Sequence, residues 1–322
     1  VIDGISYHTP FQHTLYFATQ ITDNFYGMNA DGILGLGLTL TNDDSNSLLL
    51  TLHSRGLIDK LEFSLYLTDD ITMVDQRSRI IFGGYDPSYM QEPTDSFTFA
   101  KVVESDAWAV GLNEVVIGNL SQHIHPAHAI FSSTFPDIGV PYGYLSTMIK
   151  DLNSLNISCL IQDSSPNPLC QCTPATIGQF PNITFVLDDT NVTIPPSVYV
   201  AFSPSNNYGQ VKLANYSCLI LFRTVEVKNY NKDLSGKWIF GATFMRYFYL
   251  LFDRANMQIG FSVANQSFFK REFPYAIIFI LSAITVFLTF AFIYLIWKKC
   301  AEYKKTEKRI LLDTGGYKNM NE

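Results

Sequence analysis

The sequence predicts an all-β protein that is followed by one membrane-spanning helix. Two observations predict this fold class. From residue 1 to about residue 267, short runs rich in Val, Ile, Phe, Tyr and Thr alternate with turn clusters, as is typical of sheets of short strands. Residues 275–297 then form an uninterrupted run of 23 residues without a charged side chain.

The β part contains six clear strand candidates and two short helices. The strands are expected at residues 63–67, 79–82, 109–117, 183–187, 199–202 and 247–252. Residues 48–55, which precede Gly56, and residues 144–152, with apolar side chains at helical spacing, predict helices. Gly83-Gly84 and Asp86-Pro87 predict turns.

The uncharged run is long enough to span a bilayer, because 23 residues in a helix measure about 34 Å against a hydrocarbon core of about 30 Å. Tyr275, Tyr294 and Trp297 lie near its ends, where aromatic rings favour the headgroup layer. Basic residues are concentrated after the run, at Lys298, Lys299, Lys304, Lys305, Lys308 and Arg309. The positive-inside rule therefore predicts a single-pass type I protein with a cytosolic C-terminus.

Sequons and cysteines agree with this orientation. Cys300 directly follows the run, and a reduced cytosolic thiol is expected there. The other four cysteines and all six N-x-S/T sequons precede the run, which favours a glycosylated lumenal or extracellular domain in the secretory or lysosomal/vacuolar pathway. Four cysteines allow three pairings. These residues are Cys159, Cys170, Cys172 and Cys218, with sequons at Asn119, Asn156, Asn182, Asn191, Asn215 and Asn265.

Composition excludes several classes of protein. The 322 residues carry a net charge of −7, which argues against nucleic acid as a partner. A hydrophobic content of 47% with only 16% charged residues excludes a disordered or collagen-like chain. The chain begins with Val1 and has no signal peptide, so we expect a processed chain or a fragment.

Several long segments occur in a recognisable order. They are D-G-I-L-G-L-G at 31–37, F-S-L-Y-L at 63–67, I-F-G-G-Y-D-P-S-Y at 81–89, the strand pair that opens at Trp108, W-I-F-G at 238–241 and F-D-R-A-N-M-Q-I-G-F at 252–261. An apolar strand ending at Gly occurs in both D-G-I-L-G-L-G and W-I-F-G, as a faint internal repeat. Together the segments resemble the pepsin-like aspartic proteases over residues 1 to about 262.

The resemblance implies a bilobal all-β fold with an active-site cleft between the lobes. Its domains would be an incomplete first lobe at 1–98, a second lobe at 99–267, the span at 275–297 and a cytoplasmic tail at 298–322. It also implies a disulfide from Cys218 to Cys172 or Cys170, leaving Cys159 for the other cysteine. Asp253 and Arg254 would be structural residues that hold the last strand.

The family's chemistry needs two carboxylates, one per lobe, that share a proton across a water molecule. By resemblance, the first D-T-G motif and the flap hairpin should lie well before Asp31 and outside this chain. The second should lie in A-I-F-S-S-T-F-P-D-I-G-V-P at 129–141, which resembles A-I-V-D-T-G-T-S-L-L-x-x-P. Without a gap, Ser132 takes the place of the Asp and Thr134 that of the Gly. With a gap, Asp137 is a candidate second carboxylate, although an ordinary turn residue after Pro136 is the simpler interpretation.

Three other patterns are weaker. A literal D-T-G at 313–315 lies in the charged tail, so we attribute it to chance. The histidines of 123–128 lack a Cys or carboxylate that would complete a metal site, so a loop with surface histidines, and no metal or other cofactor, is expected. Ser132 and Ser133 lack the G-x-S-x-G elbow of a serine hydrolase.

Three hypotheses for function follow. The first is a membrane-anchored aspartic endopeptidase. The second is a non-catalytic relative that binds peptides in the cleft, which the loss of Asp at Ser132 favours. The third, an adhesion-type surface glycoprotein, does not explain the ordered motifs. The expected partners are a peptide or protein in the cleft and the lipid bilayer, and a monomer is expected.

Overall fold

The structure is a computed structural model. It describes residues 33–38, 47–68, 78–141, 143–162, 165–188, 190–202, 216–225, 236–265, 289–299 and 302–304. The chain divides after Phe268 into two compact units, which are described separately. Residues 1–32, which the resemblance assigns to the first lobe, lie outside the described part, as do Asn215, Cys300 and the D-T-G at 313–315.

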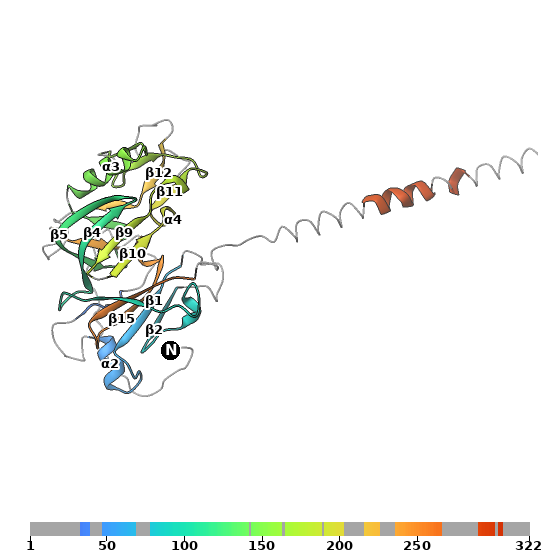
Figure 1. Cartoon of the computed structure of the whole chain (residues 1–322). Helices are drawn as coiled ribbons and strands as arrows, with labels where there is room; N and C mark the ends of the chain where they lie inside the picture. The colour runs from blue at the N-terminus through green and yellow to red at the C-terminus, as the bar shows by residue number, and fades with distance from the viewer. Residues whose placement is uncertain are drawn as a thin grey trace, which may run out of the picture. The chain divides into compact units, whose positions relative to one another are not determined.

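A five-stranded sheet joins the early and late parts of the first unit (Figure 1). Its order is β2-β1-β15-β16-β3, with bounds Arg79–Phe82, Glu62–Tyr66, Phe248–Asp253, Gln258–Val263 and Thr98–Lys101. Phe63 lies opposite Phe252 with stacked rings 4.7 Å apart between centroids. Because β15 pairs with β1 and β16 pairs with both β15 and β3, the sheet crosses the predicted boundary between residues 98 and 99.

The second sheet has seven strands in the order β10-β9-β4-β5-β14-β6-β13. Their bounds are Thr190–Ile194, Ile183–Leu187, Ala109–Ile117, Leu120–Phe131, Trp238–Phe240, Ile138–Val140 and Phe222–Thr224. Strand β14 runs parallel to β5 and antiparallel to β6, and β6 runs parallel to β13. The end of β5 and the start of β6 therefore meet beside β14, where the candidate site lies.

A third sheet of four short strands has the order β11-β12-β8-β7, with bounds Val200–Phe202, Tyr216–Ile220, Leu169–Gln171 and Cys159–Leu160. Two disulfides hold it together. Cys159 pairs with Cys170 and Cys172 pairs with Cys218, so of the three possible pairings the one with Cys172–Cys218 occurs.

The helices are short. In α2 (Leu48–Ser54) the Ser47 side chain caps the first turn, and in α3 (Tyr144–Ser154) the four apolar side chains at helical spacing are buried. The remaining helical segments are α4 (Pro196–Tyr199), α5 (Ala242–Met245) and the 3-10 turns η3 (Pro87–Tyr89) and η4 (Ile177–Gln179).

The largest apolar core cluster of the described residues is rich in aromatic rings. Phe131 and Phe185 each contact both Phe240 and Phe244, and Phe240 is stacked on Phe244 at 4.0 Å between centroids. Aromatic side chains bury large areas, so this cluster fixes where β5, β9 and β14 pack.

The strand and helix predictions are largely confirmed. Strands β1, β2, β4, β9 and β15 and helices α2 and α3 occur within a residue or two of the predicted positions, and residues 199–202 split between α4 and β11. The prediction of a loop at the histidines was wrong, because residues 123–128 lie inside β5. Pro126 falls where the register between β4 and β5 shifts past Asn113, and an irregularity of this kind accommodates proline in a strand.

In the second unit, residues 289–299 and 302–304 are helical. Within the described residues, no helix combines the length and apolar character that crossing a bilayer requires. Most of the predicted span at 275–297 lies outside these residues, so the span stays a prediction. Large apolar side chains of residues 289–299 are exposed, among them Phe290, which is 68% exposed, and Trp297, which is 67% exposed.

Candidate functional site

The candidate site is the turn at residues 132–137, which connects β5 to β6. It is anchored at both ends by backbone hydrogen bonds. Ser132 N–H donates to the Phe240 carbonyl at 3.2 Å, and Phe135 N–H donates to the Ser132 carbonyl at 3.2 Å. The turn is thus held against β14, the strand of the W-I-F-G segment.

The start of α5 holds the other side of the turn. Ala242 N–H donates to the Phe135 carbonyl at 2.7 Å, and both the N–H and the hydroxyl of Thr243 donate to the Pro136 carbonyl at 2.9 Å. A Cβ at Gly241 would collide with the backbone carbonyls of Phe135 and Asp137. Gly241 is therefore required for the backbones to approach this closely.

Two hydroxyls lie at the exposed tip of the turn. Ser132 Oγ and Thr134 Oγ1 are 3.0 Å apart, within hydrogen-bond distance of each other. In the ungapped comparison with the family motif, Ser132 is the residue predicted to stand in place of the Asp. A serine hydroxyl and a threonine hydroxyl can donate and accept hydrogen bonds, but neither ionises near neutral or acidic pH.

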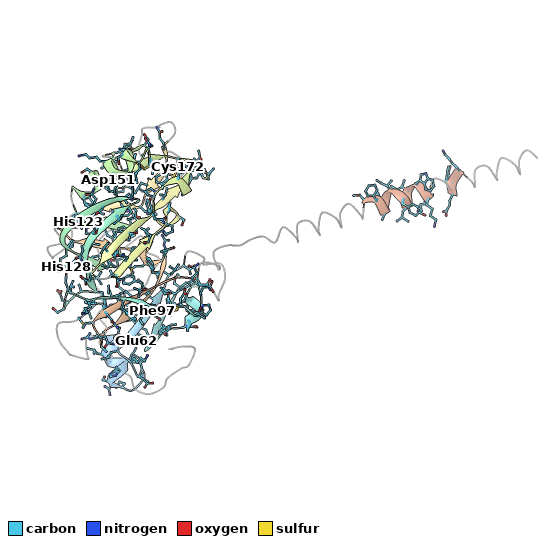
Figure 2. All side chains as sticks on the ribbon, in the orientation of Figure 1. Glu62, Phe97, His123, His128, Asp151 and Cys172 are labelled. Atoms are coloured by element: carbon cyan, nitrogen blue, oxygen red, sulfur yellow. A yellow bond between two sulfur atoms is a disulfide. The ribbon has the colours of Figure 1, made fainter. Side chains whose placement is uncertain are left out.

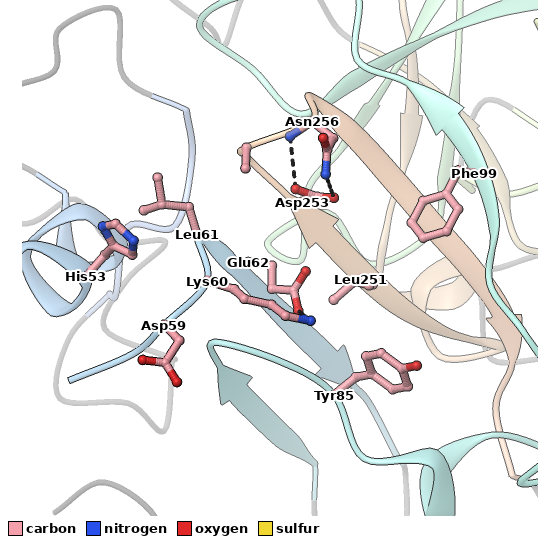
Figure 3. Close-up of a pocket in the computed structure, with 11 residues that line it drawn as sticks. His53, Asp59, Lys60, Leu61, Glu62, Tyr85, Phe99, Leu251, Asp253 and Asn256 are labelled. Carbon is pink, nitrogen blue, oxygen red and sulfur yellow. Dashed lines mark hydrogen bonds and ion pairs between the residues drawn. The ribbon is translucent and has the colours of Figure 1, made fainter. Parts of the chain in front are cut away.

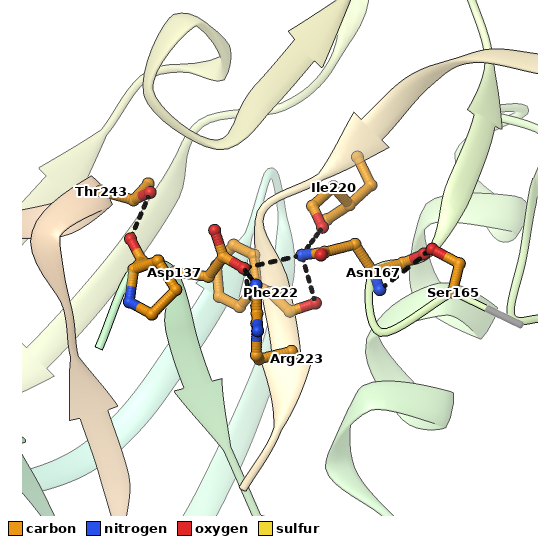
Figure 4. A network of polar contacts seen from close by, with 8 residues as sticks. Asp137, Ser165, Asn167, Ile220, Phe222, Arg223 and Thr243 are labelled. Atoms are coloured by element: carbon orange, nitrogen blue, oxygen red, sulfur yellow. Dashed lines mark hydrogen bonds and ion pairs between the residues drawn. The ribbon is translucent and has the colours of Figure 1, made fainter. Parts of the chain in front are cut away.

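Asp137 lies behind the turn and is only 6% exposed (Figure 4). Its Oδ2 accepts hydrogen bonds from Arg223 Nε at 2.6 Å, from Arg223 Nη2, and from Asn167 Nδ2 at 3.1 Å. Asn167 Nδ2 also donates to the Ile220 carbonyl at 3.1 Å. The Arg223 guanidinium lies 5.8 Å from the centroid of the Phe135 ring. Asp137 thus joins three separate segments.

This geometry separates the two sequence candidates for the second carboxylate. Ser132 projects from the turn without a carboxyl group, while the carboxylate of Asp137 is buried against a guanidinium. Sequence reasoning missed Asn167 and Arg223, because neither lies in a motif. The parallel pairing that places Arg223 opposite Gly139 brings Arg223 to Asp137, and Asn167 is held there by its hydrogen bond to the Ile220 carbonyl.

A surface pocket of about 490 Å³ lies on the five-stranded sheet, away from the turn (Figure 3). Glu62 and Asp253, opposite each other on β1 and β15, line it together with Lys60, Tyr85 and Phe99. Lys60 Nζ lies 3.3 Å from Glu62 Oε1.

The pKa of Asp253 departs from its ordinary value. Burial opposes its ionisation, but hydrogen bonds from the side chain and N–H of Asn256 and from Gln258 outweigh burial and lower the pKa. These contacts fit the structural role that the resemblance implies for Asp253.

Two histidines of β5, His123 and His128, lie near carboxylates. His128 Nδ1 lies 2.6 Å from Glu104 Oε1, to which Lys237 Nζ also donates at 2.8 Å, and His123 is mostly exposed (Figure 2). Burial opposes ionisation of Glu104, yet the hydrogen bonds from Lys237 and His128 lower its pKa overall. In the described part of the chain, no three side chains of the metal-ligating kinds gather.

Comparison with known proteins shows which family the sequence is similar to. The sequence matches the family model "Eukaryotic aspartyl protease" over residues 6–264. It is 28% identical to pepsin B of the dog, Canis lupus familiaris, over 247 residues, which are 75% of this chain and 56% of that protein. It is 28% identical to pepsin A of Gallus gallus over 74% of this chain and 57% of that protein.

Human gastricsin is 26% identical over 75% of this chain and 56% of its own length. The chain thus spans little more than half the length of the curated relatives it matches. Since the family model covers most of the chain, and since the ordered motifs form the paired strands described above, the chain belongs to the eukaryotic aspartyl proteases, the pepsin-like family.

Proposed function

We propose that this chain is a membrane-anchored relative of the pepsin-like aspartic endopeptidases that binds polypeptide where the family holds its substrate and, as the chain stands, does not cleave it. The family reaction is proteolysis by a water molecule that a pair of aspartates activates. One observation carries the proposal, namely that Ser132 stands on the turn where this lobe should present a carboxylate.

The chemistry supports this reading. The reaction needs one group to accept a proton from water while a second donates one to the peptide carbonyl. Two carboxylates do this because they share a single proton. Ser132 and Thr134 can hold a peptide group by hydrogen bonds, but they cannot take the place of an ionised carboxylate. The activity of the whole protein also depends on the other lobe.

Peptide hydrolysis through Asp137 is the second candidate, since Asp137-Ile-Gly139 preserves the order of a D-x-G motif. Its burial argues against it, because a catalytic carboxylate must reach water and the scissile carbonyl. The contacts with Arg223 and Asn167 instead suit a structural role.

The membrane anchor and the lumenal placement are part of the proposal. The uncharged run at 275–297, the basic flank after it and the sequons before it support them. The exposed apolar side chains of residues 289–299 also favour a lipid environment for that helix.

The test uses the full-length protein in detergent and a labelled peptide library at pH 3 to 6, a window set by free carboxyl pKa values of about 4. We expect peptide binding without turnover, and no effect of Asp137→Asn on turnover. The double variant Ser132→Asp/Thr134→Gly should introduce turnover if the other lobe supplies its Asp, and Ser133→Asp is the matched control. Turnover by the unaltered protein that Asp137→Asn abolishes would refute the proposal.

A further inference from the structure

Four of the sequon asparagines lie exposed on the surface of the described structure. They are Asn119 in the turn between β4 and β5, Asn156 after α3, Asn182 before β9 and Asn191 on β10. Surface turns are where an enzyme can reach an asparagine side chain, and a sequon on an exposed turn is a stronger signal than a sequon in the sequence alone.

Three of these asparagines meet at one point of the fold. Gly118 N–H donates to the Asn182 carbonyl at 3.0 Å, so Asn119 and Asn182 are neighbours. A Cβ built on Gly118 would lie 3.2 Å from Pro181 Cβ and 3.6 Å from Leu155 Cδ1. Gly118, which precedes Asn119, therefore lies beside both Leu155, which precedes Asn156, and Pro181, which precedes Asn182.

Hydrogen bonds to neighbouring elements hold the segments around Gly118, Leu155 and Pro181. Tyr199 is buried, and its hydroxyl donates to the Pro181 carbonyl at 2.6 Å, which ties the chain before Asn182 to α4. The Gln122 amide on β5 donates to the Asp151 carboxylate on α3 at 2.9 Å (Figure 2). These contacts keep the three sequons in the same arrangement.

This point lies at the far end of the second lobe from the five-stranded sheet. Val110 near the start of β4 bridges to Val102 beside β3, and β4 then continues to Ile117. At about 3.4 Å per residue, the turn at Asn119 lies about 30 Å along the strand from that bridge. Figure 1 likewise draws α3 at the opposite end of this unit from β1 and β15.

We propose that N-linked oligosaccharides on Asn119, Asn156 and Asn182 form one cap over this end of the second lobe. In each transfer the amide Nδ2 forms a bond to the anomeric carbon of a lipid-linked diphospho-oligosaccharide. The bond between that carbon and the diphosphate oxygen breaks, the lipid diphosphate leaves and the amide gives up one proton. The inference rests on the lumenal placement in the proposed function.

Two other sequons serve as comparisons. Asn191 is exposed but lies on the strand at the end of the described sheet order, beside Val186 rather than at the point of convergence. Asn265 is half-buried, and its Nδ2 donates to the Ser88 carbonyl at 3.2 Å. We expect a sugar at Asn191 that is independent of the cap, and little or none at Asn265.

The test expresses the full chain behind a secretion leader in eukaryotic cells. Enzymatic release of the sugars in ¹⁸O water, followed by peptide mass spectrometry, measures the occupancy of each asparagine. The composition of the sugar on Asn119 is then compared between Thr184→Ala, which removes the sequon of Asn182, and Thr184→Ser, which retains it. Thr193→Ala removes the sequon of Asn191 and is the matched control.

Sugars that share one cap shield each other from trimming enzymes. We therefore expect occupancy of all three asparagines and a more extensively processed sugar on Asn119 in Thr184→Ala alone. An unchanged sugar on Asn119, or empty cap asparagines in a chain whose Asn191 is occupied, would overturn the cap. Membrane retention under alkaline extraction and protease access to the tail test the proposed placement separately, so a failure of that placement is distinguishable.

Discussion

The contact between Asp137 and Arg223 predicts a large loss of stability when the guanidinium is removed. In Arg223→Met the carboxylate of Asp137 stays buried, with Asn167 as its remaining partner in the described network. Removing one member of a buried ion pair costs about 3–5 kcal/mol. The Arg223 side chain is 29% exposed and water can partly replace it, so we expect a decrease of about 2–4 kcal/mol in the free energy of unfolding.

Urea unfolding of the full chain in detergent measures this loss. Trp108 and Trp238 are buried in the first unit, and their fluorescence reports its unfolding. With a denaturant dependence of about 3 kcal/mol per molar, the midpoint should fall by about 1 M. Arg223→Lys should recover only part of the loss, because an ammonium group cannot reproduce the two contacts that Nε and Nη2 of the guanidinium make with Asp137 Oδ2.

The double variant Asp137→Asn/Arg223→Met is the control. It removes both charges and keeps an oxygen that accepts from Asn167, so we expect it to be more stable than Arg223→Met alone. If Arg223→Met unfolds within about 0.5 kcal/mol of the unaltered protein, or if the double variant is as unstable as the single one, the pair does not stabilise the turn.

Three further predictions concern the scaffold around the site. Gly241→Ala should cost more than about 3 kcal/mol, as measured by urea unfolding, because its Cβ would meet backbone carbonyls that cannot rotate away. Asp253→Ala should cost about 1–3 kcal/mol at pH 7. Because the folded pKa of Asp253 is lowered, its contribution is present above the unfolded value of about 4 and is lost as the pH falls through the folded value, so the two unfolding curves should converge in acid. Cys218→Ser should destabilise by about 4 kcal/mol and Cys159→Ser by about 3, since the disulfides separate 46 and 11 residues, and equal losses would contradict the loop-entropy argument.

The sequence predicted the strands well where a local pattern and a pairing partner coincide. F-S-L-Y-L at 63–67 pairs with the strand that ends in Phe252 and Asp253, where the second family motif begins. The strand at 123–128 was missed because its histidines were interpreted as a surface loop, and the shifted register that accommodates Pro126 depends on β4, a neighbouring strand. Periodicity cannot reveal such an irregularity.

The surroundings of the candidate site were less predictable. Comparison with the family motif singled out Ser132, which lies on the turn after β5, and its equivalence to the family Asp stays a prediction. The partners of Asp137 were not found, because Asn167 lies 30 residues and Arg223 lies 86 residues further along the chain. Isolated polar residues at such separations carry no signal until the sheet brings them together.

The contacts of the turn also explain how the position of Ser132 can lose a carboxylate without loss of the fold. Backbone amides of α5, the absence of a side chain at Gly241 and the buried network of Asp137 hold the turn. None of these contacts involves the side chain at position 132, whose hydroxyl reaches only Thr134 in the described network. The shape of the turn and the identity of the chemical group at its tip are therefore separable. The proposed function requires this separation, because a relative that binds peptide without cleaving it would keep the turn while lacking the acid at its tip.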